Sequence, residues 1–229
     1  MKLITLFRRL YFHVAFHFYV KHKLTQTDVV SMNGLTLKVP PTVFHPLLFR
    51  SSAIFADHLQ MLDCSSKHVL DIGCGSGLLS LVAASKGAQV TSLDINHDAI
   101  VATEENAKAN NLHHLITTIE NDGLYNLNFT QKFDYIIMNP PFYMGTPTTV
   151  ADRAWKGGQD YDYLQIIAHQ ARNTLKQDGV FIFIISTDAE VKRIEKIFLN
   201  ECFNLIPVSA RKLLFETFTI YHAKLSSQS

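Results

Sequence analysis

Short apolar runs alternate with longer amphipathic segments along the chain from residue 68 onward. Five runs are typical of buried strands, because they are short, rich in β-branched or aromatic residues and bounded by polar residues. They cover residues 69–72, 89–93, 115–119, 133–138 and 180–185. Helices are expected around them at residues 78–86, 98–110, 160–176 and 188–199. Strands that alternate with helices of this length predict a mostly parallel sheet with helices on both faces.

Two further strands are expected near the C-terminus, over residues 203–209 and 215–225. No helical segment separates them, so they should pair in the antiparallel direction. Together with the five earlier runs they predict an α/β fold. Its sheet should be doubly wound and seven-stranded, mostly parallel, with an antiparallel C-terminal strand.

Residues 1–62 carry a different pattern, which we interpret as an N-terminal element that precedes a main domain at residues 63–229. Asn33-Gly34 lies between two arms of alternating apolar residues, which is a strong signal for a β-hairpin over residues 29–39. A helix is expected over residues 47–62, leading into the main domain.

Apolar residues at helical spacing predict one more helix, over residues 3–20. Arg8 and Arg9 interrupt the apolar stretch, which is too short to span a bilayer, and no small-residue cleavage site follows it. We expect this helix to pack on the core or on a second subunit. Binding at a membrane surface is the alternative.

Composition limits the classes of function. Of 229 residues, 47% are hydrophobic and 18% charged, which is enough apolar material for a substantial core. The formal net charge of +1 gives no bulk sign of a nucleic-acid partner. Cys64, Cys74 and Cys202 are odd in number and widely spaced, which fits a reducing cytoplasm rather than a disulfide framework. No CxxC or HExxH motif is present, and no metal site is expected.

A glycine-rich loop, Asp71-Ile72-Gly73-Cys74-Gly75-Ser76-Gly77, joins the first strand of the main domain to its first helix. Glycines allow a tight turn and the close approach of a ligand, and such sheets bind ligands beyond the carboxyl ends of their strands. The Gly-x-Gly-x-Gly spacing differs from the Gly-x-Gly-x-x-Gly of dinucleotide-binding loops, which disfavours a dinucleotide oxidoreductase. Cys74 is interpreted as a small filler residue rather than a nucleophile.

The loop resembles motif I of the class I S-adenosylmethionine-dependent methyltransferases, whose fold is Rossmann-like. This resemblance implies that S-adenosylmethionine is the cofactor. It also implies that Asp71 and the loop glycines Gly73, Gly75 and Gly77 surround the methionine part of that cofactor.

Two more aspartates follow strands of the predicted sheet. The resemblance implies that Asp94, which closes the second strand, accepts hydrogen bonds from the ribose hydroxyls. Asp122, after the third strand, is implied to contact the adenine amine. An Asp that follows a strand is often only a helix cap, so each residue has that alternative. Asn96 is better placed than Asp94 to cap the following helix.

Asn139-Pro140-Pro141-Phe142 ends the apolar run at residues 133–138. The two prolines stop the strand, fix their φ angles and contribute no N–H, so the tip offers the Asn139 side chain and a row of carbonyls. Such an acceptor-rich tip suits a substrate that presents N–H donors. The end of this fourth strand should lie beside the first strand, and Asn139 should therefore lie near the glycine loop.

This tip resembles the (Asn/Asp)-Pro-Pro-(Tyr/Phe) motif of methyltransferases that act on exocyclic base amines or on glutamine side chains. The resemblance implies that Asn139 faces the methyl group of the cofactor. The Asn139 oxygen and the Pro140 carbonyl would accept the two N–H bonds of the methyl acceptor. Phe142 would stack on the flat acceptor group, and Pro141 and Tyr143 would contact the substrate.

Three other segments resemble HemK-like glutamine methyltransferases, above all the branch that modifies eukaryotic and archaeal release factors. The first is Ala154-Trp155-Lys156-Gly157-Gly158, in which Trp155 is implied to contact the substrate. The second is Glu216-Thr217 in the last predicted hairpin. The third joins Val43-Phe44-His45-Pro46 to Ser51-Ser52, in an N-terminal element that is implied to close over the cofactor.

The leading hypothesis is N-methylation of a planar amide or amine nitrogen, with a glutamine of a release-factor-like protein favoured as the acceptor. An adenine N6 or guanine N2 amine in RNA or DNA is the alternative. Phe142 supports that alternative, because the glutamine enzymes usually carry Tyr there and Phe is common among RNA amine methyltransferases. A small-molecule amine and a non-catalytic partner with the same fold also stay open.

Overall fold

The computed structural model describes residues 25–48, 50–141, 145–146, 148, 157–158, 160–213 and 216–226. The helix expected over residues 3–20 lies outside these ranges and stays a prediction. The elements, in chain order, are β1 (Asp28–Met32), β2 (Leu35–Val39), α2 (Arg50–Met61), β3 (His68–Ile72), α3 (Leu78–Ser85), β4 (Gln89–Asp94), α4 (His97–Ala109), β5 (Ile116–Glu120), β6 (Phe133–Met138), α5 (Asp162–Thr174), β7 (Leu175–Ser186), α6 (Val191–Asn200), β8 (Phe203–Lys212) and β9 (Thr217–Leu225).

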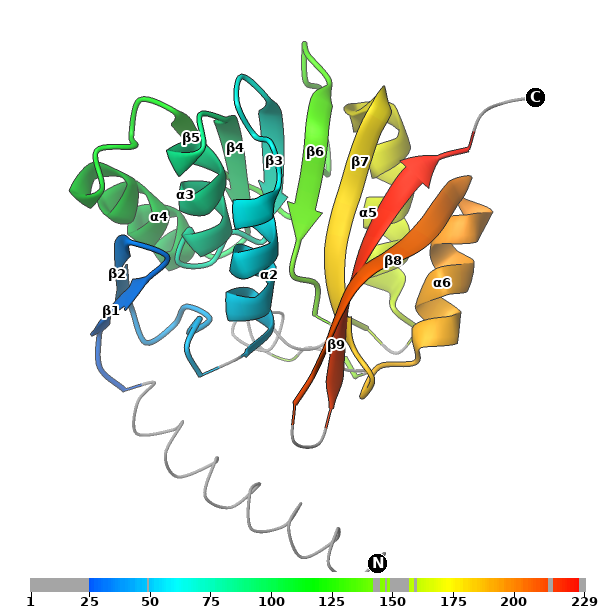
Figure 1. The fold of residues 1–229 in the computed structure, drawn as a ribbon, viewed down its shortest axis with the longest axis horizontal. Coiled ribbons are helices and arrows are strands. Elements are labelled where there is room, and N and C mark those ends of the chain that lie inside the picture. Colours follow the sequence, from blue (N-terminus) through cyan, green and yellow to red (C-terminus); the bar gives the residue numbers. More distant parts are fainter. Residues whose placement is uncertain are drawn as a thin grey trace, which may run out of the picture.

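The main sheet of the described residues contains seven strands in the order β5-β4-β3-β6-β7-β9-β8 (Figure 1). The first five strands of this order, β5, β4, β3, β6 and β7, pair in parallel. Strand β9 pairs antiparallel with both β7 and β8. The predicted doubly wound, mostly parallel sheet is therefore confirmed. The chain reverses its direction of travel across the sheet between β3 and β6. In open sheets, that switch point is where ligands bind.

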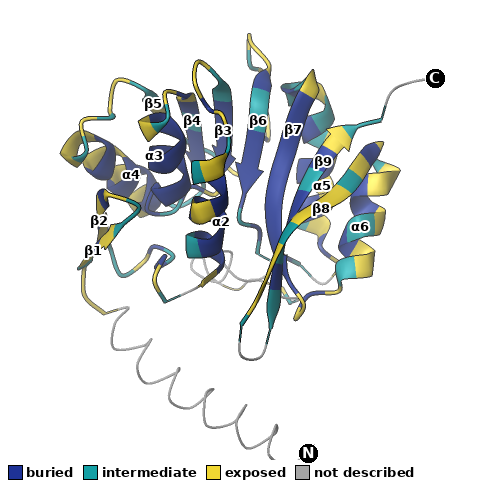
Figure 2. Ribbon diagram, viewed as in Figure 1, coloured by how far each residue is buried: buried dark blue, intermediate teal, exposed yellow. Residues whose placement is uncertain are grey.

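Helices cover both faces of the sheet, with α2, α3 and α4 on one face and α5 and α6 on the other (Figure 1). Side chains along β7 alternate between the two cores that result: Ile182 and Ile184 belong to the first, and Phe181 and Phe183 to the second. Strand β7 lies inside the molecule and is buried along most of its length (Figure 2). Burial on both faces explains why its sequence is a continuous apolar run.

The N-terminal hairpin forms as predicted. Asn33 and Gly34 have φ angles of 52° and 77°, the left-handed pair that a two-residue hairpin turn requires. Strand β2 is fixed to helix α4 by the Asn106 side chain, which accepts from the Lys38 N–H at 2.7 Å and donates to the Lys38 carbonyl at 2.9 Å. The hairpin and α2 share one hydrophobic core with α3. The proposed boundary after residue 62 stays a prediction.

The border between α5 and β7 differs from the prediction. The helix ends at Thr174, and β7 already begins at Leu175, where its first residue pairs with Phe133. The pairing is irregular between Leu175 and Val180, and a Cβ on Gly179 would lie 2.8 Å from the Leu175 side chain. Leu175 is fully buried in the second core. The helix therefore ends at Thr174 rather than at residue 176, and Leu175 is instead buried as the first residue of β7.

Candidate functional site

A cavity of about 1020 Å³ runs along the carboxyl-terminal edge of the sheet. The loops after β3, β4 and β5 line one side, which we call the β3–β5 end. The tip of β6 and the start of α2 lie in the middle, and residues that follow β7 and precede β9 line the β7–β9 end. Clefts that hold one drug-sized ligand measure roughly 300–1,000 Å³. At about 1020 Å³, this pocket lies at the upper end of that range.

The glycine loop folds tightly between β3 and α3. Gly77 has a φ of 79°, and a Cβ there would lie 2.9 Å from the Leu81 side chain and 3.0 Å from Thr103, so only glycine fits. Gly73 also has a positive φ of 75°, but nothing lies within 4 Å of the place where its Cβ would be. Its backbone borders open space in the pocket, and Gly75 and Cys74 line the same wall. A ligand can thus approach this backbone closely.

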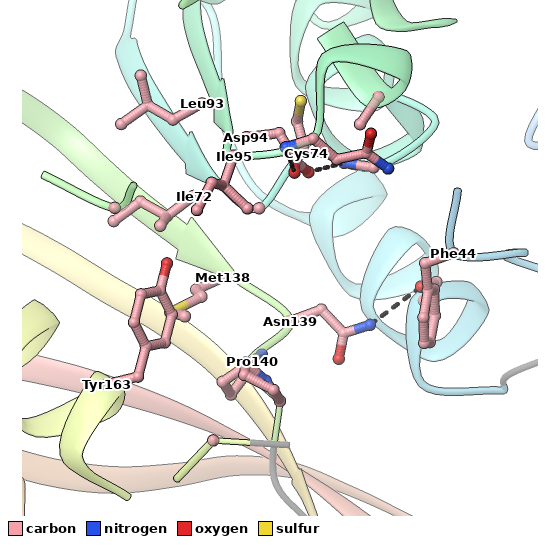
Figure 3. Close-up of a pocket in the computed structure, with 18 of the residues that line it drawn as sticks. Phe44, Ile72, Cys74, Leu93, Asp94, Ile95, Met138, Asn139, Pro140 and Tyr163 are labelled. Atoms are coloured by element: carbon pink, nitrogen blue, oxygen red, sulfur yellow. Dashed lines mark hydrogen bonds between the residues drawn. The ribbon is translucent and has the colours of Figure 1, made fainter. Parts of the chain in front are cut away.

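Asp94 joins the glycine loop to the start of α4 (Figure 3). Its two oxygens accept hydrogen bonds from the Gly75 N–H and the Asn96 N–H, both at 2.9 Å. Burial raises the pKa of this carboxyl, although the backbone N–H donors favour the charged form. The cap of α4 is Asn96, whose side chain accepts from the Asp98 N–H at 3.0 Å. Asp94 is therefore not the cap of α4, and it lines the pocket instead.

Asp71 is fully buried beneath the glycine loop and is not among the residues that line the pocket. One of its oxygens accepts from the Ser80 hydroxyl at 2.5 Å, and Ser80 in turn lies 2.7 Å from the Ser92 hydroxyl. Its Oδ1 has no hydrogen-bond partner in the described chain. Burial raises the pKa of Asp71 to about 7. Its contacts connect β3, α3 and β4, and its implied contact with a ligand stays a prediction.

The loop after β5 closes the β3–β5 end. Asp122 lines the pocket in this loop, whose preceding residue, Asn121, donates its N–H to the Asp94 carbonyl at 2.9 Å. A Cβ on Gly123 would lie 2.6 Å from the Ile167 side chain, so the loop packs directly on α5. Tyr163, which no sequence motif indicated, points into the same space from α5 (Figure 3). Only the fold brings this tyrosine to the loop, because no motif surrounds it.

Asn139 lies at the tip of β6, next to the end of β3, as predicted (Figure 3). Its Nδ2 donates to the hydroxyls of Ser51 at 3.1 Å and Ser52 at 3.0 Å, both on α2. Its Oδ1 is buried and has no hydrogen-bond donor within the described residues. An unpaired buried acceptor costs about 1–3 kcal/mol. A ligand that presents an N–H at this point would relieve that cost.

Pro140 and Pro141 line the pocket beside Asn139. A Cβ on Gly157 would lie only 2.4 Å from the Pro141 carbonyl oxygen, so this backbone lies directly against the tip of β6. The fold thus brings Gly157 and Gly158, from the segment at residues 154–158 that resembles the HemK-like enzymes, to the pocket. Phe142, Tyr143 and Trp155 lie outside the described residues, and their implied contacts stay predictions.

The β7–β9 end of the pocket is acidic. Asp162 at the start of α5, Asp188 after β7 and Glu216 before β9 line it. Glu216 is half-buried and accepts from the Ser186 hydroxyl at 2.6 Å, and burial raises the pKa of this carboxyl. Arg50 is the only lysine or arginine among the described residues that line the whole pocket. Asp162 and Asp188 carry no sequence signal of their own, because only the sheet topology brings them to this edge.

Within the ranges that the structure describes, no three or more His, Cys, Asp or Glu side chains are grouped so that they could hold a metal ion. Nor is any of the helices there both long and apolar enough to cross a bilayer.

Comparison with known proteins identifies the family. The family model of the methyltransferase small domain matches residues 34–221. A Methanocaldococcus jannaschii protein with the provisional name protein N5-glutamine methyltransferase is 34% identical over 206 residues, which cover 85% of this chain and 98% of that protein. The ribosomal RNA small subunit methyltransferase C of a Marinomonas species is 37% identical over 170 residues, which cover 72% of this chain and 44% of that protein.

A solved structure supports the same fold. The 16S rRNA N2 G1207 methyltransferase of T. thermophilus, in complex with AdoMet and guanosine, has a TM-score of 0.65 at 21% identity, over 87% of this chain and 50% of that chain. The present chain spans half or less of the two rRNA methyltransferases. The family model, by contrast, covers most of the chain. The protein therefore belongs to the methyltransferase small domain family and is an S-adenosylmethionine-dependent methyltransferase.

Proposed function

We propose that this protein transfers a methyl group to a planar NH2 nitrogen, which Asn139 holds in the middle of the pocket. The observation that carries this proposal is the buried Asn139 Oδ1, an acceptor that lacks a donor. The Pro140 carbonyl follows it directly in the chain and supplies a second acceptor. Two acceptors at one strand tip match the two N–H bonds of an amide or aromatic amine.

The residues at the β3–β5 end fit S-adenosylmethionine. The open space beside Gly73 admits a ligand against the backbone, and Asp94 offers a carboxylate with lone pairs beyond those that its two N–H partners use. We propose that these residues hold the methionine and ribose parts, with Asp122 near the adenine. When bound, the cofactor supplies an activated methyl group on a sulfonium sulfur.

In the proposed reaction, Asn139 and Pro140 act by orientation. An amide or aromatic NH2 has its lone pair delocalised, so its nucleophilicity depends on how its N–H bonds are held. Two acceptors in the plane of the N–H bonds direct the lone pair toward the methyl carbon. With S-adenosylmethionine bound beside this nitrogen, the transfer would form a nitrogen–carbon bond, break the carbon–sulfur bond with its electron pair left on sulfur, and release one proton from the nitrogen to solvent. Positioning of this kind supplies most of the rate enhancement when the leaving group is good.

We propose a glutamine side chain of a release-factor-like protein as the acceptor. The acidic lining at the β7–β9 end supports this choice, because Asp162, Asp188 and Glu216 would repel the phosphates of a nucleic acid. A glutamine amide carries no charge and enters such a pocket without that penalty. The archaeal relative, which matches over nearly its whole length, carries a glutamine methyltransferase name and supports the same choice.

An exocyclic base amine in RNA is the second candidate. It is favoured by the identity to a ribosomal RNA methyltransferase, which at 37% is slightly higher than the identity to the archaeal relative. That relative, however, has more than half of its length outside the match.

The test is a labelling assay with methyl-tritiated S-adenosylmethionine and the purified chain. Release factor, a peptide containing Gly-Gly-Gln and deproteinised total RNA are offered in parallel, and a Gly-Gly-Glu peptide is the matched control. We expect label on the release factor that survives nuclease and is removed by protease, and none on the control peptide. Label on RNA alone would reject the glutamine proposal and favour the second candidate.

We further propose that the protein acts in the cytoplasm. The three cysteines form no disulfide, which supports a reducing compartment. We also propose that the helix expected over residues 3–20 contacts a second subunit or a membrane surface.

A further inference from the structure

We propose that Ser51 and Ser52 are positioning residues that hold the Asn139 side chain with its oxygen toward the methyl acceptor. This inference rests on the proposed function, in which the Asn139 oxygen accepts an N–H of the acceptor. It extends the site to helix α2, which precedes the glycine loop in the chain and belongs to neither of the two motifs that carry the chemistry.

The hydrogen bonds use the whole donor capacity of the Asn139 amide. Its nitrogen carries two N–H bonds, and the two serine hydroxyls lie at 3.1 Å and 3.0 Å from it. The oxygen of the same amide has no donor among the described residues. One end of the amide is thus satisfied by the protein, and the other end is left for a ligand.

An asparagine amide has two orientations that differ by a half-turn about its last bond, and they exchange oxygen and nitrogen. The reversed orientation would present an NH2 group to the NH2 group of the acceptor, donor against donor. The two serine acceptors stabilise the productive orientation, because each gives one N–H a partner. The reversed orientation would leave neither N–H with a serine partner.

The serines are held firmly enough for this task. Ser51 and Ser52 are only 2% and 7% exposed, which is unusual for hydroxyls in the first turn of a helix. Helix α2 also buries Phe55 and Leu59 in the first core. Because α2 is packed in the core at these positions, its first turn keeps a fixed distance from the tip of β6.

The same element covers the glycine loop. Val43 and Phe44, just before α2, lie 3.9 Å from the place where a Cβ on Gly75 would be. The segment that covers the β3–β5 end and the serines that hold Asn139 therefore belong to one continuous stretch of chain. A shift of α2 would therefore disturb both the cover over the glycine loop and the position of Asn139.

The test compares the Ser51→Ala/Ser52→Ala double variant of the full chain with the wild type. We expect kcat to fall by about 10- to 100-fold, because a small misplacement of a catalytic group has effects of this size. The KM for the acceptor and the Kd for S-adenosylmethionine should change by less than about threefold. The Ser51→Thr/Ser52→Thr variant keeps both hydroxyls and should recover most of the lost kcat. Ser85→Ala, which removes a helical serine hydroxyl remote from the pocket, is the control.

A nuclear magnetic resonance measurement gives a readout that does not depend on turnover. The side-chain NH2 signals of Asn139 are assigned by their absence from the Asn139→Ala variant. We expect them to shift in the double alanine variant and to return toward their wild-type positions in the threonine variant. If the double alanine variant does not fold, the two single alanine variants are measured instead, and each should shift these signals in part.

Two results separate failure of this inference from failure of the proposed function. If Asn139→Ala loses turnover while the serine variants keep wild-type kcat and unchanged Asn139 signals, the positioning role is wrong and the proposed function stands. If Asn139→Ala itself keeps wild-type turnover, the proposed function is wrong and the inference falls with it.

Discussion

Asp94 shows how one side chain can organise the β3–β5 end of the pocket. Its carboxylate accepts one N–H from the glycine loop and one from the turn before α4, so it holds these two walls together. Burial raises its pKa, while the two N–H donors stabilise its charged form. The remaining lone pairs of this carboxylate are available to ribose hydroxyls. This makes Asp94 both a structural link and a proposed ligand contact.

Replacement of Asp94 by alanine should therefore weaken cofactor binding more than turnover. Hydrogen bonds to a charged group contribute roughly 1.5–3 kcal/mol each, so we expect the Kd for S-adenosylmethionine to rise by about 10- to 100-fold. Isothermal titration calorimetry measures this Kd directly. The matched control is Asp178→Ala, which removes an exposed carboxyl of β7 away from the pocket. An unchanged Kd in the Asp94 variant would remove this residue from the cofactor site.

At the residue scale, site residues that lie in a contiguous motif can be predicted from the sequence. Contacts between residues that are far apart in the chain cannot. Asn139 and the glycine loop are readable because their chemistry lies within four to seven neighbouring residues. The contact of Ser51 and Ser52 with Asn139 spans 88 and 87 residues. The resemblance to HemK-like enzymes indicated these serines only as part of an N-terminal element that closes over the cofactor. Their shared partner emerges only when α2 packs beside β6.

Helix α2 is linked to strand β9 of the main sheet by a pair of histidines. His58 on α2 and His222 on β9 lie with their Nε2 atoms 3.0 Å apart. A hydrogen bond between two imidazoles requires that at least one of them is neutral. Burial, followed by the nearby His58 and Lys224, lowers the pKa of His222 to about 4, and burial also lowers the pKa of His58.

This pair should make the protein less stable in mild acid. Between pH 6.5 and about 4 the unfolded chain binds more protons at His222 than the folded chain does, so the free energy of unfolding falls as the pH falls. With allowance for solvent screening of a half-exposed group, we expect a loss of about 1 kcal/mol from pH 7 to pH 5. Chemical denaturation of the wild type and of a His222 variant at both pH values measures this contribution as a difference between the two proteins.

The matched comparison is the His222→Gln variant, which cannot titrate and should lose less stability over the same interval. Asp71 acts in the opposite direction, because its raised pKa favours the folded state in acid. For this reason the test uses the difference between wild type and His222→Gln in the pH dependence of the free energy of unfolding. The pH dependence of the wild type alone combines both contributions. His113→Gln, at an exposed position, controls for the loss of any histidine. Identical slopes for wild type and His222→Gln would contradict the role of the pair.

At the scale of elements, most helices and strands follow from periodicity, because their apolar residues are spaced by local geometry. The border between α5 and β7 does not follow from periodicity, because Leu175 pairs with Phe133 and is buried in the second core. The histidine pair is equally invisible in the sequence. Its two members lie 164 residues apart and only the sheet brings them together.

Across the whole molecule, the pocket extends along one edge of the sheet with different chemistry at its two ends. The β3–β5 end has glycine backbone and Asp94, the middle has Asn139 and its serines, and the β7–β9 end is acidic. The parallel sheet and its switch point were predictable from alternating strands and helices. The insertion of β9 between β7 and β8 was not, because strand order depends on long-range pairing. That insertion places Glu216 at the pocket.

The most direct test of this account is the effect of Asn139→Ala on turnover and on cofactor binding, measured on the same preparation. Loss of one preorganised polar group that acts on the reacting atoms lowers kcat by about 100- to 1,000-fold, so we predict a decrease of that size. The calorimetric Kd for S-adenosylmethionine should stay within about threefold of the wild type. Asn204→Ala, at an exposed position on β8, is the control and should leave both values unchanged. A kcat near the wild-type value, or an equal loss of cofactor binding, would contradict the claim that Asn139 orients the methyl acceptor.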